Sequence, residues 1–218
     1  MNVFGTVAAT LVAAALTATA ASAVTVATAG TGGEGFTLSG GGTIVETNHG
    51  FEHLYDQSVT TPASTWVWDS VDGKGSTDLT FEVSFDLTGY DLASAEVTGV
   101  WGVDNYGYMR LNGTEVASLT EYGHGTFKEL LSFSITDDAL FQDGINTLSF
   151  QVVNELVEDQ GPAAFRAALS VLADFEVVTG VSSTNGGRAP APVPLPASVL
   201  MLGAALAGLG LARRRRAA

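Results

Sequence analysis

The sequence predicts an all-β protein, with one jelly-roll or β-sandwich domain between an N-terminal signal peptide and a C-terminal single transmembrane helix. Short runs of alternating apolar and polar residues fill the middle of the chain, with turn residues every ten or so positions. Uncharged apolar segments stand near both ends. The predicted parts are a signal peptide (residues 1–23), the β domain (24–178), a flexible linker (179–192) and a sorting tail (193–218).

The first 23 residues have the pattern of a secretory signal peptide. A small-residue apolar segment, residues 7–20, is followed by Ala21, Ser22 and Ala23, which fit the A-x-A rule for cleavage after Ala23. No Lys or Arg precedes the apolar segment. The alternative is a buried alanine-rich helix, but the C-terminal tail favours export through a secretion translocon and cleavage by signal peptidase.

The predicted strands follow from alternation. In residues 79–85, Leu79, Phe81, Val83 and Phe85 fall on one face. Further strands are expected at residues 95–101, 130–135, 145–153 and 165–178, after a flexible or edge-strand lead-in at residues 24–42. Residues 163–172 could also form a helix by composition.

A β-hairpin is expected around Asn112 and Gly113. Alternating runs lie on both sides of this pair, and Asn-Gly suits a two-residue turn in which both residues need a positive φ.

The tail has three parts in a fixed order. Val193, Pro194, Leu195, Pro196 and Ala197 precede an uncharged apolar run at residues 198–212. The basic residues Arg213, Arg214, Arg215 and Arg216 follow that run. The arginines are expected on the cytoplasmic side, and a 15-residue helix spans only about 22 Å of a bilayer core of about 30 Å.

This tail resembles the VPLPA variant of the PEP-CTERM sorting signals of Gram-negative bacteria. The resemblance implies an exosortase-type membrane enzyme that cleaves near the motif at residues 193–197. It also implies an inner-membrane intermediate, held through the C-terminal helix, that passes to the cell surface or the extracellular matrix.

Charge excludes one large class of partner. All 23 acidic residues lie between Glu34 and Glu176, and only five basic residues in the whole chain precede the terminal arginines, so the exported part carries −18. Nucleic acid is excluded as a partner, because phosphate binding needs a basic face. The chain has no cysteine, so about 155 residues must bury a core without disulfides.

The middle of the chain resembles the galactose-binding-like jelly rolls. The resemblance is carried by Trp101, Asp104 and Asn105 with the following Leu-Asn-Gly at residues 111–113, by Gly144 to Leu148, and by the turn at residues 161–166. It implies a jelly roll of the kind found in sugar-binding modules, adhesion domains and inert spacers.

Asp104 and Asn105 are the candidate metal ligands. They follow a predicted strand and lie between glycines, where side-chain and backbone oxygens could meet a Ca²⁺ ion. Turn formation alone explains the same residues. No other cofactor is expected.

Aromatic residues are the candidates for ligand binding. Trp66 and Trp68 are two positions apart, as are Tyr106 and Tyr108, so each pair would share one face of a strand. An exposed aromatic ring stacks on the apolar face of a sugar, whereas core packing is the alternative, above all for the tryptophans.

These observations predict an exported binding module without catalysis, in contact with extracellular polysaccharide. A structural matrix or surface protein with no small ligand is the alternative. A glycan-active hydrolase is the third and weakest hypothesis, since hydrolysis needs two carboxylates at a set separation across a cleft. Neither a phosphate-binding loop nor a G-x-S-x-G elbow occurs in the sequence.

The short apolar span behind a processing motif predicts that the C-terminal segment is removed. Intact-mass analysis of protein recovered from the cell surface or medium should therefore give a mass that lacks residues 213–216. Recovery of the complete C-terminus there would contradict the prediction.

Overall fold

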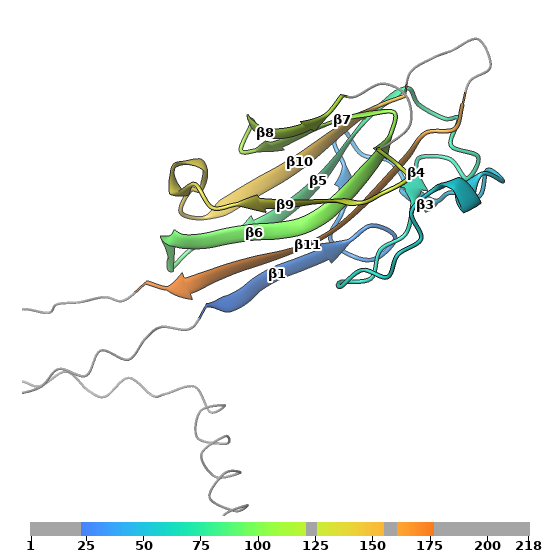
Figure 1. Ribbon diagram of the computed structural model, residues 1–218. Helices are drawn as coiled ribbons and strands as arrows, with labels where there is room; N and C mark the ends of the chain where they lie inside the picture. Colours follow the sequence, from blue (N-terminus) through green and yellow to red (C-terminus); the bar gives the residue numbers. More distant parts are fainter. Residues whose placement is uncertain (1–22, 121–125, 155–160, 177–218) are drawn as a thin grey trace, which may run out of the picture. The chain divides into compact units, whose positions relative to one another are not determined.

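Two antiparallel sheets packed face to face form a β-sandwich, as drawn in Figure 1. The structure is a computed structural model, and it describes residues 23–120, 126–154 and 161–176. The prediction of an all-β fold is confirmed. The predicted linker and tail, and all of the signal peptide except Ala23, lie outside the described residues. None of the helices within those ranges has the length and apolarity to cross a membrane.

One sheet has six strands and the other has five. The six-stranded sheet contains β1 (Val24–Gly30), β3 (Val45–Glu46), β4 (Val67–Trp68), β6 (Tyr90–Asp104), β9 (Leu131–Ile135) and β11 (Ala164–Phe175). Its order is β3-β4-β11-β6-β9, and β1 also pairs with β11. The five-stranded sheet contains β2 (Thr37–Leu38), β5 (Asp78–Asp86), β7 (Tyr106–Leu111), β8 (Thr114–Leu119) and β10 (Ile145–Val153), in the order β2-β5-β10-β7-β8. Two short 3₁₀ helices, η1 (Glu52–Leu54) and η2 (Asp138–Leu140), lie in loops.

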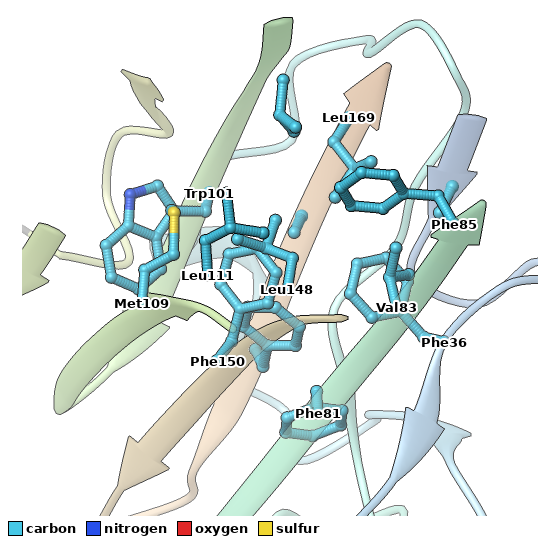
Figure 2. Close-up of a cluster of buried hydrophobic side chains, with 14 of the residues drawn as sticks. Phe36, Phe81, Val83, Phe85, Trp101, Met109, Leu111, Leu148, Phe150 and Leu169 are labelled. Carbon is cyan, nitrogen blue, oxygen red and sulfur yellow. The ribbon is translucent and has the colours of Figure 1, made fainter. Parts of the chain in front are cut away.

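The core consists of the inward side chains of both sheets (Figure 2). The alternation predicted for β5 is confirmed, because Phe81, Val83 and Phe85 are buried while their neighbours are not. Phe165 of the six-stranded sheet packs against two rings of the five-stranded sheet. Its ring centre lies 4.5 Å from that of Phe81 and 5.1 Å from that of Phe150.

Strand β11 settles the question that composition left open at residues 163–172. The segment is a strand, and its edges pair with β6 on one side and with β1 and β4 on the other. Phe165, Ala167, Leu169 and Val171 all belong to the main core. Packing of every second residue in the main core, together with pairing on both edges, outweighs the helix propensity of the alanines.

The long β6–β11 ladder separates two ends of the domain. Ala164 pairs with Asp104 at one end, and Phe175 pairs with Tyr90 at the other. At about 3.3 Å per residue the two ends of β11 are roughly 35 Å apart. Val24 pairs with Ala173, so β1 starts and β11 ends at the Tyr90 end, which we call the terminal end. We call the Asp104 end the loop end.

The predicted hairpin joins β7 to β8. Asn112 has a φ of 51° and Gly113 a φ of 85°, as the expected turn requires. The Asn112 side chain also ties the turn to β10. Its Oδ1 accepts a hydrogen bond from the Thr147 backbone at 3.0 Å, and its Nδ2 donates to Asn146 Oδ1 at 2.8 Å.

The substitution Gly113→Val should cost on the order of 1–2 kcal/mol, because it forces a β-branched residue into the left-handed region. No heavy atom lies within 4 Å of the position a Cβ would take, so backbone conformation alone is tested. Thermal unfolding measures the effect. Gly161→Val is the control, since that site is equally open and has no positive φ. Equal melting temperatures for both variants would contradict the prediction.

Candidate functional site

The two tryptophans are packed inside the protein and do not share a face. Trp68 is fully buried in the main core, 5.9 Å from the ring centre of Phe81. Trp66 is 4% exposed and lies in a second cluster with Tyr55 and Ala164. Strand β4 begins only at Val67, and the expected alternation therefore does not extend to Trp66. Packing, the alternative for these residues, is what the structure has.

The two tyrosines do share a face. In β7, Gly107, Met109 and Leu111 are buried, while Tyr106 and Tyr108 alternate with them on the outer side of the five-stranded sheet. Tyr108 stands opposite Gln151 of β10 on one side and Ser118 of β8 on the other. A partly exposed aromatic ring thus lies among polar neighbours on a regular, rigid surface.

Arg110 organises this surface. Its guanidinium carbon lies 5.6 Å from the ring centre of Tyr108. Nη1 donates to Gln151 Oε1 at 3.1 Å, and Nη2 lies 3.3 Å from Glu115 Oε2. Gln151 Nε2 in turn donates to Asp78 Oδ2 at 2.9 Å. We call the surface formed by Tyr106, Tyr108, Arg110, Gln151, Asp78 and Glu115 the outer platform.

The outer platform combines the two kinds of group that carbohydrate recognition uses. The ring of Tyr108 offers an apolar face, and the amide, guanidinium and carboxylate groups offer donors and acceptors. The Arg110–Glu115 pair is partly exposed and contributes at most about 1 kcal/mol to stability. Its main effect is to hold the guanidinium in place across the sheet.

Asp104 lies at the loop end and is only 7% exposed. Its Oδ2 accepts a hydrogen bond from the Tyr55 hydroxyl, and its Oδ1 accepts one from Asn105 Nδ2 at 2.8 Å. Burial raises the pKa of the Asp104 carboxyl to about 6, although the Tyr55 hydrogen bond opposes the shift. Desolvation together with the Asp104 charge raises the pKa of the Tyr55 hydroxyl as well.

A Ca²⁺ ion at Asp104 stays a prediction. Each carboxylate oxygen already accepts one hydrogen bond, so an ion would share these oxygens with the Tyr55 hydroxyl and the Asn105 amide. Across residues 23–120, 126–154 and 161–176, no cluster of three or more His, Cys, Asp or Glu residues could hold a metal.

A pocket of about 290 Å³ opens beside η1, in the loops that cover the outer side of the six-stranded sheet. The sequence pattern did not indicate it. Arg166 of β11 lies in its wall, together with Trp66 and the two carboxylates Glu46 and Glu52. The Glu52 carboxylate accepts backbone hydrogen bonds from His49 and Gly50. Partial burial raises the pKa of Glu52, but these hydrogen bonds outweigh burial and leave the pKa below its usual value.

Comparisons with known proteins do not assign a family. No family model matches the chain, and no curated protein sequence matches it either. Among solved structures, it is similar to a GH31 alpha-xylosidase from Xanthomonas citri, with 11% identity over 65% of this chain and a TM-score of 0.28. The match spans only 15% of the xylosidase.

Sequence analysis missed several residues that the fold brings together. Arg110 was detectable in principle, because it lies two positions after Tyr108 in a predicted strand and so faces the same side. The pairing of Gln151 with Tyr108 depends on strand register, which the sequence did not specify. Arg166 had a signal of its own, since a charged residue with apolar neighbours on both sides in a strand requires buried polar partners.

The substitution Asp104→Asn should stabilise the protein progressively as the pH rises. The folded state holds the carboxyl proton more tightly than the unfolded chain does, since the pKa is about 6 instead of 3.8. The resulting penalty is absent below about pH 4 and complete above pH 6, and it is on the order of 2–3 kcal/mol. The asparagine side chain does not titrate, so the variant has no such pH-dependent loss of stability.

Denaturant unfolding of both proteins at pH 4 and pH 7 measures this difference. Tyr55→Phe serves as the matched variant, because it removes the hydrogen bond that lowers the pKa of Asp104 and should deepen the loss at pH 7. Parallel pH profiles for wild type and Asp104→Asn would contradict the prediction.

Proposed function

We propose that this protein is exported, is sorted through the membrane by its VPLPA-type tail, and acts at the cell surface or in the extracellular matrix as a non-catalytic glycan-binding module. The observation that carries the binding proposal is the outer platform, where Tyr108 lies beside Arg110 and Gln151. A polysaccharide chain would lie across β5, β10, β7 and β8, with one sugar ring on Tyr108. In this proposal the β-sandwich is a jelly roll of the galactose-binding-like kind.

The position of the chain ends supports a tethered or once-tethered module. Both Val24 and Phe175 belong to the terminal end, roughly 35 Å along β11 from Asp104. The platform faces sideways and the loop end lies at the other extreme, so neither is obstructed by the point where the chain leaves the sandwich. The net charge of −18 keeps such a module soluble and free of nucleic acid.

Two other functions compete with this proposal. A purely structural surface protein needs no partly exposed aromatic ring among polar side chains, so the position of Tyr108 disfavours this alternative. A hydrolase is favoured by one observation, the presence of both Glu46 and Glu52 in the same pocket. The lowered pKa of Glu52 is the opposite of what a general acid needs.

The substitution Tyr108→Ala should weaken binding to soluble polysaccharide roughly twofold to tenfold, since stacking on an aromatic ring contributes about 0.5–1.5 kcal/mol beyond buried area. A glycan array with the purified protein identifies the polysaccharide, and affinity electrophoresis then measures retention. Phe175→Ala is the control, because this ring is 59% exposed but lies at the terminal end, stacked on Tyr90. Equal retention of the two variants would remove the outer platform from the proposal.

A further inference from the structure

The pocket at the loop end contains a buried cation with hydrogen-bonding capacity to spare. Arg166 is 5% exposed, and its Nε donates to Ser64 Oγ at 3.0 Å. Nη1 donates to the backbone oxygen of Asp56 and Nη2 to that of Ser58, both at 2.7 Å. A guanidinium has five N–H groups, so two remain after these three bonds. Neither of the two ion pairs among the described residues involves Arg166.

Two carboxylates stand in the wall of the same pocket. Glu46 is exposed, and its side chain makes no hydrogen bond or ion pair with another described residue. Glu52 is held by backbone N–H groups, which fix the position of its charge. Hydroxyl and amide groups of Thr60, Ser64 and Gln57 complete the polar wall, and Trp66 also lines the pocket.

These charges select a neutral ligand that can both donate and accept. An anion would meet the guanidinium but also two carboxylates, whereas a cation would meet the carboxylates but also a buried positive charge. A sugar hydroxyl accepts from a guanidinium and donates to a carboxylate at the same time. The volume of about 290 Å³ is at the lower limit of small-molecule sites, which suits one sugar ring and not a chain.

We infer that this pocket is a second carbohydrate site, which takes a single neutral sugar residue, such as the end of a chain or a side branch. The inference does not depend on the outer platform, because the platform belongs to the five-stranded sheet and Arg166 to the six-stranded sheet. With both sites occupied, one molecule would join two glycan chains.

Saturation-transfer NMR on the purified full-length protein tests the pocket, with glucose, galactose, mannose and xylose as neutral probes and glucuronate as the anionic probe. At least one neutral sugar should bind saturably, and glucuronate at least fivefold more weakly. Ala63→Trp should abolish binding, since Ala63 is an exposed residue of the pocket wall. Glu46→Gln should weaken it at least fivefold, while the exposed control Glu34→Gln and the platform variant Tyr108→Ala should leave it unchanged.

Four results would overturn the inference: no saturable neutral sugar, tighter binding of glucuronate, binding that survives Ala63→Trp, or equal effects of Glu34→Gln and Glu46→Gln. Release of reducing sugar from an oligosaccharide by wild type, lost in Glu46→Gln, would replace it with hydrolysis. The protein could fail to bind a monosaccharide in the pocket and still be retained by polysaccharide in a way that depends on Tyr108. That result would contradict the second site and leave the proposed function unchanged. Monosaccharide binding without polysaccharide retention would support the pocket as a sugar site and contradict the proposed function of the outer platform.

Discussion

Phe165 is the contact on which the rest of the sandwich depends. It is fully buried at the start of the longest shared ladder, and its ring lies within 6 Å of Phe36, Phe81 and Phe150. The first of these precedes β2, and the others lie on β5 and β10, so one side chain joins strands of both sheets. The next residue, Arg166, points to the opposite side of the same sheet, where it holds the backbone of residues 56–58. Two consecutive residues of β11 therefore contribute to different parts of the protein: Phe165 packs the core, and Arg166 holds the loop that forms the pocket.

Burial of the Arg166 guanidinium and the Asp104 carboxyl at the loop end lowers the free energy of unfolding. Removing a guanidinium and a carboxylate from water is unfavourable, and hydrogen bonds from fixed partners offset only part of that cost. Burial lowers the pKa of Arg166, against the nearby Asp56 charge, and raises the pKa of Asp104. The main core contains no such groups and stabilises the fold, while the second cluster around Tyr55 and Trp66 orders the loops.

The elements predicted correctly from the sequence are those in which local pattern and tertiary burial agree. The alternating β5, the Asn112-Gly113 turn and the bounds of β10 needed no information beyond neighbouring residues. Strand β11 was ambiguous because alanine favours helix, and pairing with three other strands decided it. Trp66 and Trp68 were treated as one strand face, although Trp66 lies in the irregular segment before β4 and the two side chains belong to different clusters. The pocket escaped prediction since its wall comes from loops without periodicity and from Arg166, more than 100 residues away from the loop atoms it contacts.

The antiparallel pairing of the first and last strands, β1 and β11, has a mechanical consequence. Under the proposed function, a pull between a surface attachment C-terminal to Glu176 and a sugar in the pocket at the loop end would act along the length of β11. Its hydrogen bonds to β6, and to β1 and β4 on the other edge, would then carry the load together in shear. Strands loaded in this way must break many bonds at once, whereas a strand peeled from one end breaks them one at a time. The connectivity thus fits the proposed function at a surface, where the domain would have to resist flow or stretching.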